Sequence, residues 1–289
     1  MKRAMVLKEI WKDAERVFTA LSDLFFPRVC AVCGRRLLAG ERHLCTWCEA
    51  DLPLTYFWMS PHNPMADRYN GLIQRDLDWK SEVGETGLRV PGYEHAAALF
   101  FYMSGTGYTR ITQRLKYHGD IACGRYYAGM LAGYLSESRE FRDVDMVMPV
   151  PLHWARRWSR GFNQAETIAR VIAERLGAEL VTDVLRRVRR TKTQTKLGVE
   201  AKLSNVRGAF MADDGALARH LSLRAVNVPS AHAASHTGRR IHIVLVDDVF
   251  TTGATLHSCR AALDLSLERL GVEEMAVEIS AVTLASVVS

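Results

Sequence analysis

The sequence contains no stretch of about 18 uncharged apolar residues, so no segment is predicted to span a membrane. The first residues also lack the apolar run of a secretory signal peptide, because Lys8, Glu9 and Lys12 interrupt it. Internal repeats are absent as well. We therefore expect a cytoplasmic protein, in whose reducing environment the six cysteines favour metal binding over disulfides.

The 289 residues suit one large or two small domains, and a hydrophobic content of 48% is ample for a buried core. The net charge of +6 permits acidic partners without requiring them. We expect four parts: an amphipathic helix over residues 1–28, a zinc-binding module over 29–55, a connector over 56–95 and an α/β domain over 96–289. The connector is rich in aromatics, so we expect it to lie partly ordered against one of the domains.

Two Cys-x-x-Cys pairs follow the predicted first helix: Cys30 and Cys33, then Cys45 and Cys48. This spacing places four thiolates around one tetrahedral point, as structural zinc requires. Gly34 and Gly40 allow the tight turns that such a site needs. His43 is an alternative ligand, but four cysteines complete the set without it. A zinc ion held by four protein ligands has no open position, so its role is structural.

Strands and helices alternate in the second half of the chain. Strands are predicted over 97–103, 144–150, 180–185, 242–246 and within 275–284, with helices over 107–115, 125–136, 164–176 and 256–270 and a short element at 208–211. Asn163 should cap the helix that begins at Gln164, with Glu166 completing a capping box. The tract 219–240 reads as a polar loop with solvated histidines, including His220, and Cys123 and Cys259 as buried apolar residues. This alternation predicts a doubly wound, mostly parallel sheet.

Two adjacent carboxylates, Asp247 and Asp248, come where the strand 242–246 is expected to end. A short loop and a helix follow them; the loop residues that matter are Thr251, Thr252, Gly253, Ala254 and Thr255. Free N–H groups at a helix N-terminus attract anions, and hydroxyl donors together with a glycine suit a phosphate. The acid pair suits the hydroxyls of a ribose or a metal ion beside it. Together these groups predict a site for a ribose 5-phosphate.

Two loops concentrate positive charge. Residues 152–164 contain three arginines, three large aromatic rings and no acid, and residues 186–207 contain eight cations against one acid. The candidate anion-binding residues are Arg156, Arg157, Arg160, Arg189, Arg190, Lys192 and Lys196. A solvated surface is the ordinary explanation of such a run, but this excess favours binding of a polyanion. Pyrophosphate would use one or two of these cations. Single-stranded nucleic acid would use more, with bases stacked on the rings.

The loop from Asp247 to Thr255 resembles the phosphoribosyl-pyrophosphate (PRPP) loop of type I phosphoribosyltransferases. Four further segments occur in order with it: the paired cysteines, Leu115–Gly119, Pro149–His153 followed by Arg160–Gln164, and Thr193–Lys196 followed by Asn205–Phe210. Together they resemble the ComF family of competence proteins, also known as the GntX type. The resemblance implies a phosphoribosyltransferase fold with an N-terminal zinc finger and a role with incoming single-stranded DNA during natural transformation. It also implies other competence proteins as partners, such as a helicase or a DNA-processing protein.

By the same resemblance, Asp247 and Asp248 would face the ribose hydroxyls and the Mg²⁺-bound substrate, as catalytic residues if the protein is an enzyme, while residues 251–255 hold the 5-phosphate. Three functions remain open. The protein could handle DNA with a PRPP-like pocket, it could be a phosphoribosyltransferase that displaces pyrophosphate onto an unidentified acceptor, or it could be a non-catalytic nucleotide sensor. Steep salt dependence of single-strand binding favours the first, and Mg²⁺-dependent release of pyrophosphate favours the second.

Overall fold

The computed structural model describes residues 27–85, 90–117, 119–153, 158, 161–189, 208–223, 240–272 and 276–287. The chain forms two compact units, which divide between Leu52 and Pro53. The helix expected over residues 1–28 falls almost wholly outside the described residues. The boundaries expected at residues 55 and 95 stay predictions.

The first unit has little regular structure. Val29 and Arg36 form an antiparallel bridge, and α2 (Thr46–Ala50) is its one helix among the described residues. Gly34 and Gly40 have φ angles of 74° and 100°, a backbone region that glycine adopts without a steric penalty. The two tight turns expected from the sequence are therefore present, and the first of them directly follows Cys33.

A five-stranded parallel sheet forms the centre of the second unit. Its strands are β1 (Ala96–Phe101), β2 (Met146–Pro149), β3 (Glu179–Leu180), β6 (Ile241–Phe250) and β7 (Val277–Ser286). They lie in the order β1-β7-β6-β2-β3, and every neighbouring pair is parallel. The central strands read as continuous apolar runs because both of their faces are covered. The predicted α/β class and mostly parallel sheet are confirmed.

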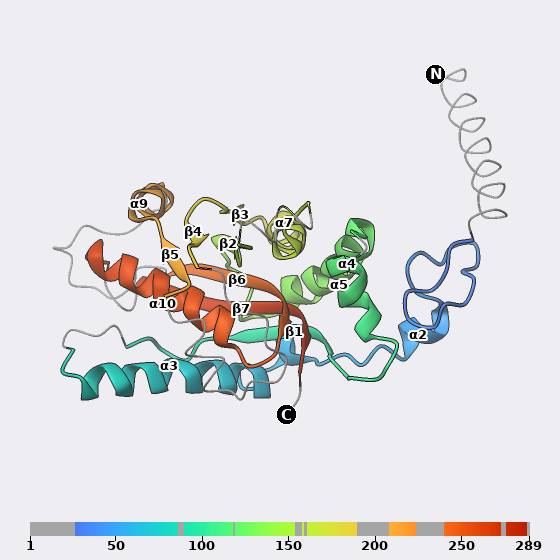
Figure 1. Ribbon diagram of the computed structural model, residues 1–289, viewed down its shortest axis with the longest axis horizontal. Coiled ribbons are helices and arrows are strands. Elements are labelled where there is room, and N and C mark those ends of the chain that lie inside the picture. The colour runs from blue at the N-terminus through green and yellow to red at the C-terminus, as the bar shows by residue number, and fades with distance from the viewer. Residues whose placement is uncertain are drawn as a thin grey trace, which may run out of the picture. The chain divides into compact units, whose positions relative to one another are not determined.

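Helices cover the sheet on both sides (Figure 1). On one side, α5 (Ile121–Glu137) and α7 (Gln164–Leu176) pack against each other, with α4 (Thr109–Tyr117) beside α5. On the other side, α10 (Ala254–Arg269) packs on β6 and against α3 (Pro64–Glu82). This arrangement is doubly wound, and it leaves the loops that follow the strands at one edge of the sheet.

The segment expected to be a connector is mostly helical. It contains a 3₁₀ turn (η1, Phe57–Met59) and the 19-residue α3, whose N-terminus is capped by Asn63 through bonds from Met65 N and Ala66 N. Residues 53–55 also run beside β1, where Phe101 N donates to Pro53 O. The described part of the segment falls within the second compact unit.

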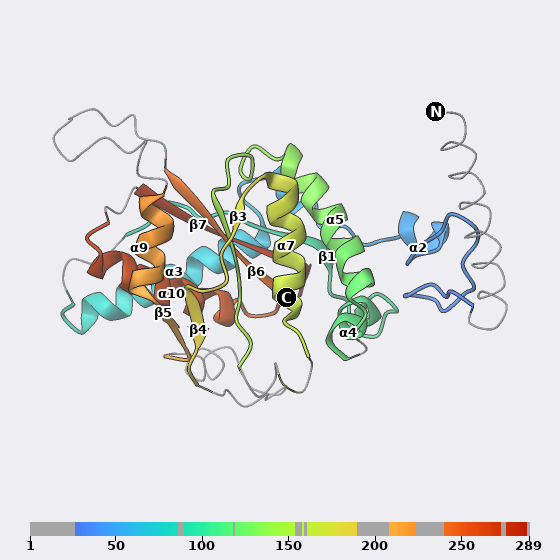
Figure 2. The same ribbon diagram turned by 90° about the horizontal axis from the view of Figure 1, so that it is seen from above.

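A small antiparallel hairpin lies apart from the main sheet. It consists of β4 (Leu185–Arg187) and β5 (Phe210–Ala212), followed by α9 (Asp214–Ser222), and Figure 2 shows it beside α10. The strand expected over 180–185 is therefore wrong as one element, because its two ends belong to different sheets. The expectation of a solvated His220 is also wrong: it lies in α9, and its ring nitrogens are 3.0 Å from Glu179 Oε1 and 2.9 Å from Asp183 Oδ1.

The strand β6 continues to Phe250, because β7 still pairs with Val249 and Phe250. Both acids therefore lie within the strand instead of after it.

Among the described residues, no helix combines the length and the apolar character needed to cross a bilayer.

Candidate functional site

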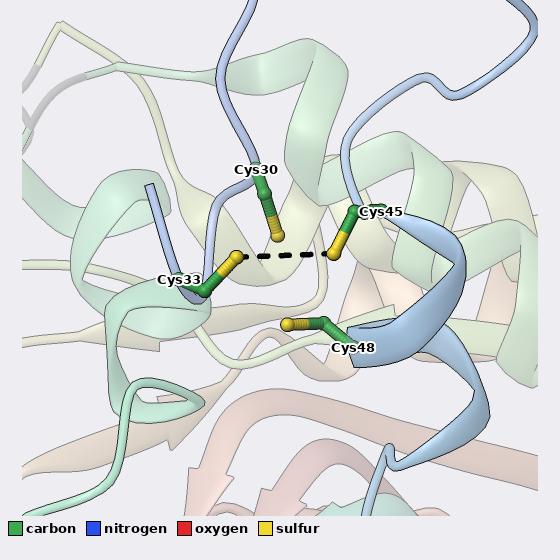
Figure 3. Close-up of side chains that lie close together, drawn as sticks. All are labelled: Cys30, Cys33, Cys45 and Cys48. Atoms are coloured by element: carbon green, nitrogen blue, oxygen red, sulfur yellow. Dashed lines mark hydrogen bonds between the residues drawn. The ribbon is translucent and has the colours of Figure 1, made fainter. Parts of the chain in front are cut away.

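Four cysteine sulfurs converge in the first unit (Figure 3). The Sγ atoms of Cys30, Cys33, Cys45 and Cys48 all lie within 4.8 Å of one another, and His43 is not part of this cluster. Cys33 Sγ and Cys45 Sγ are 3.8 Å apart. Two sulfurs bound to one zinc ion at about 2.3 Å with tetrahedral geometry are separated by about 3.8 Å. The donor set and its spacing therefore fit a tetrahedral zinc ion.

Hydrogen bonds and burial shift the pKa values of the cysteine thiols in this cluster. Burial opposes ionisation of Cys30, but hydrogen bonds from the backbone of Cys33, Cys45 and Val32 lower the pKa of this thiol to about 6. The pKa of Cys45 is also lowered, whereas burial and the neighbouring cysteines raise the pKa of Cys48, so the surroundings favour the zinc-binding thiolate at some of the four positions and oppose it at another.

The acid pair lies near the carboxyl end of β6 in the second unit. Asp247 is paired in register with Thr283 of β7, and Asp248 is 9% exposed. The backbone N–H of Asp248 donates to Asp247 Oδ1 at 2.8 Å, which fixes the first carboxylate. The charge of Asp248 opposes ionisation of Asp247, so the pair favours a cation or hydroxyl donors beside it.

Two cations reach the acid pair from other elements. Lys116, at the end of α4, has its Nζ 3.1 Å from Asp248 Oδ2. Arg187 of β4 lies over the Phe210 ring, 5.1 Å from the ring centre, and its charge acts on Asp247. Neither residue was among the site residues predicted from the sequence. Lys116 could have been found because it belongs to the Leu115–Gly119 segment, which carries part of the family resemblance. Arg187 could not be distinguished from the seven other cations of residues 186–207.

The electrostatic balance at Asp247 is unfavourable to its charge. Burial of the carboxylate and the neighbouring charge of Asp248 raise the pKa of Asp247 to about 7. The hydrogen bond from the backbone of Asp248 and the charges of Lys116 and Arg187 act in the opposite direction, but they do not cancel the increase. A bound cation or ribose hydroxyls would relieve this cost, which is an arrangement typical of ligand sites.

The turn after the acid pair is shaped by Gly253, which precedes the first residue of α10 and has a φ of 81°. A Cβ at this position would lie 2.8 Å from Leu72 Cδ1 and 2.8 Å from Phe250 Cζ, so only glycine fits. The sequence predicted close approach of a ligand here, but the close neighbours are the protein's own side chains. The first turn of α10 contains no acid, and its N-cap is a glycine without a side chain, so the N–H groups of this turn suit an anion; only a long bond to Thr252 engages one of them.

The hydroxyls of the loop differ in exposure. Thr251 is exposed and Thr255 is half-buried, whereas Thr252 is 8% exposed and its Oγ1 accepts a long bond from Ala254 N at 3.4 Å. Thr252 therefore supports the turn, and Thr251 is the hydroxyl most open to a ligand.

The basic candidates are only partly placed. Arg156, Arg157, Arg160, Arg190, Lys192 and Lys196 lie outside the described residues. Arg189 is described and continues from β4, where its backbone N–H donates to Ala209 O at 3.5 Å. Arg186 pairs with Asp213 at 2.9 Å, so its charge is already used within the hairpin. Both ends of the second basic loop are thus attached to the hairpin that carries Arg187.

No protein-family model matches the chain. The chain is similar to "Competence protein F" of Haemophilus influenzae, with 24% identity over 257 residues that cover 88% of this chain and 96% of that protein. It is also similar to the "DNA utilization protein YhgH" of Salmonella typhi and of Escherichia coli K12, with 31% and 29% identity over 112 residues. These two matches cover 39% of this chain and span only 40% of each relative.

Among solved structures, the chain is similar to TT1426 from Thermus thermophilus, with a TM-score of 0.24 and 19% identity, over 55% of this chain and 83% of that one.

Proposed function

Because this chain is a homologue of competence protein F, which confirms the resemblance to the ComF family, we propose that it binds PRPP or a related ribose phosphate and handles single-stranded DNA. The observation that carries the ligand is the acid pair at the end of β6. Its two carboxylates lie near the end of β6, and the acid-free N-terminus of α10 begins a few residues later, so diol acceptors and a phosphate site are close in the chain.

Each part of such a ligand has a matching group. The N–H groups at residues 253–255 and the Thr251 hydroxyl would bind the 5-phosphate. Asp247 and Asp248 would accept hydrogen bonds from the ribose hydroxyls and share an Mg²⁺ ion with them. Lys116 and Arg187 add positive charge beside the acids, where a diphosphate group needs it.

Two metals complete the proposal. Mg²⁺ prefers oxygen ligands, and the raised pKa of Asp247 is that of a carboxylate whose ionised form needs a nearby cation. When bound, Mg²⁺ would neutralise charge on the diphosphate. The cysteine cluster would hold zinc in a structural role, since its four sulfurs already have the spacing of tetrahedral ligands.

The DNA part of the proposal rests on charge and on relatives. Arg156, Arg157 and Arg160 are interleaved with Trp154, Trp158 and Phe162, the combination that a single-strand groove needs. Trp158 is 89% exposed, as a ring that stacks on bases has to be. The printed names of two relatives refer to competence and to DNA utilization, which is consistent with this role.

A second candidate is an active phosphoribosyltransferase that acts on an unidentified acceptor. The position of Lys116 favours it, because a cation 3.1 Å from Asp248 could also stabilise charge on a departing diphosphate. Mg²⁺-dependent release of pyrophosphate from PRPP with a panel of acceptors tests this candidate, and no release with any acceptor counts against it.

The DNA proposal is tested by the affinity for a labelled single strand at several salt concentrations. We expect log affinity to fall steeply with log salt, and a variant with Arg156, Arg157 and Arg160 changed to glutamine to have a shallower slope. Arg170→Gln is the matched control, since this arginine pairs with Glu166 within α7. Failure of the wild type to bind at low salt would refute the DNA role and leave the ligand proposal standing.

A further inference from the structure

A polar cavity of about 260 Å³ lies at the opposite edge of the sheet from the acid pair. It is lined by His95, Arg139, Glu140, Asp143, Arg240, His242 and Glu278. His95 precedes β1, and His242 and Glu278 are the second residues of β6 and β7, so the cavity lies where three neighbouring strands begin. His242 is five residues before Asp247 on the same strand, or about 16 Å along it. The cavity is therefore separate from the proposed PRPP site.

The floor of the cavity is formed by the Glu278 carboxylate and the rings of His95 and His242. Glu278 Oε1 is 3.7 Å from His95 Nε2 and 3.7 Å from His242 Nε2. His242 is 7% exposed and is held by Ser280 Oγ, 2.9 Å from the same nitrogen. Burial and the nearby charges of Glu94 and Glu140 raise the pKa of Glu278 to about 7, which again marks a carboxylate that favours a positive partner.

The rim of the cavity carries charges of both signs. Arg139 and Arg240 are exposed guanidinium groups, and Glu140 and Asp143 lie beside them. The lining as a whole has three carboxylates and two guanidinium groups, a formal charge of −1 with neutral histidines. A complementary ligand has an anionic group for the rim, an ammonium group for the floor and a net charge of +1.

The spacing of the floor disfavours a metal ion. Two nitrogen or oxygen ligands of one zinc ion in tetrahedral geometry are about 3.3 Å apart. The observed 3.7 Å is longer, and in the part of the chain that the structure describes these three residues do not form a group with all ligand atoms within 4.8 Å. An ammonium nitrogen about 2.9 Å from Glu278 Oε1 and from His95 Nε2 allows a wider separation of its two acceptors and supplies one N–H to each.

We propose that this cavity binds a free α-amino acid with a basic side chain, with its α-ammonium on Glu278 and His95 and its carboxylate at Arg139 and Arg240. The rim acids Glu140 and Asp143 then face the cationic side chain. A polyamine fits less well because it has no anionic group to bind the two arginines. This site goes beyond the proposed function and depends neither on PRPP nor on DNA.

The test is calorimetric titration of the full chain with L-lysine and two relatives of it. Cadaverine lacks the carboxylate and 6-aminohexanoate lacks the α-ammonium. We expect L-lysine to bind with a dissociation constant of about 1 mM or lower and each relative to bind at least tenfold more weakly. No binding of L-lysine at about 10 mM would overturn the proposal, and so would equal binding of cadaverine, since that result assigns the arginines no role.

Variants locate the binding. Glu278→Gln should weaken L-lysine at least tenfold, whereas Glu268→Gln, an exposed carboxylate on α10, should leave it unchanged. Arg240→Ala changes an exposed side chain with little risk to folding, and it should reduce the preference for L-lysine over cadaverine. Thermal unfolding confirms that each variant is folded. Binding that survives both Glu278→Gln and Arg240→Ala lies elsewhere and contradicts the assignment.

Discussion

Arg260 is 1% exposed, yet it carries a full charge inside the α/β unit. Its guanidinium pairs with Glu94 Oε1 at 2.8 Å and with Asp264 Oδ2 at 3.1 Å, and Glu94 Oε2 accepts a bond from Ile279 N at 2.7 Å. The network therefore connects α10, the segment before β1 and the backbone of β7. Removing the arginine leaves both carboxylates without compensation.

We predict that Arg260→Met lowers the free energy of unfolding by about 3–5 kcal/mol, because Glu94 and Asp264 both lose their counter-charge. Urea denaturation measures the change. The double variant Glu94→Gln with Arg260→Met should be less destabilised than Arg260→Met alone, because it removes one of the two carboxylates that the arginine compensates. A cost below about 1 kcal/mol for Arg260→Met would show that water reaches the site and that the pairs contribute little.

Asp247 provides a prediction about pH. Its pKa is about 7 in the folded protein and about 3.9 in an unfolded chain, so ionisation is easier after unfolding. The resulting loss of stability is absent below pH 4, grows between pH 4 and 7 and is complete above pH 7. Asp247→Asn removes this loss and can still accept the Asp248 N–H.

We therefore expect Asp247→Asn to be as stable as the wild type at pH 4 and more stable by at least about 1 kcal/mol at pH 8. Chemical denaturation of both proteins at several pH values gives the comparison. A difference that is constant across this range would mean that Asp247 ionises normally in the fold.

At the level of elements, the entry and exit of α10 offer a matched pair of glycines. Gly253 before the helix and Gly271 after it both have positive φ, at 81° and 65°. A Cβ at Gly253 meets two side chains at 2.8 Å, whereas a Cβ at Gly271 has nothing within 4 Å.

Gly271→Ala should thus cost only backbone strain, about 1 kcal/mol, and Gly253→Ala should cost about 2–4 kcal/mol because overpacking adds to that strain. Thermal or urea unfolding separates the two values. Gly253→Ala should also weaken ribose-phosphate binding, since the turn has to shift. Equal costs at both ends would contradict the tight contact with Leu72 and Phe250.

Elements with local signals were predictable from the sequence, and elements that depend on distant partners were not. The bounds of α7 were predicted correctly because Asn163 caps it and Gly177 ends it with a φ of 68°. The length of β6 was not, since pairing with β7 extends it past the acids. The separation of β3 from β4 was also missed, because two different sheets divide one apolar stretch. Lys116 was missed as a site residue for the same reason, because α4 brings it to Asp248 from a remote part of the sequence.

At the level of the whole molecule, the two units have separate cores and separate chemistry. The cysteine cluster lies within residues 27–52, and the acid pair with its helix lies within the α/β unit. We therefore expect metal binding by the cysteine cluster to stabilise the first unit without changing the acid pair.

We predict that Cys33→Ser releases zinc and destabilises the first unit while the α/β unit keeps its affinity for PRPP within about twofold, which is a change of about 0.4 kcal/mol. Metal analysis and calorimetry measure the two effects. A loss of PRPP binding as large as that of Asp248→Asn would contradict the independence of the units.

The most direct test of the central claim is a crystal structure of the protein with PRPP and Mg²⁺. The account predicts the 5-phosphate on the backbone N–H groups of residues 253–255 and the ribose hydroxyls on Asp247 and Asp248. Lys116 or Arg187 should lie beside the diphosphate. A ligand bound elsewhere, or a 5-phosphate away from the N-terminus of α10, would contradict it.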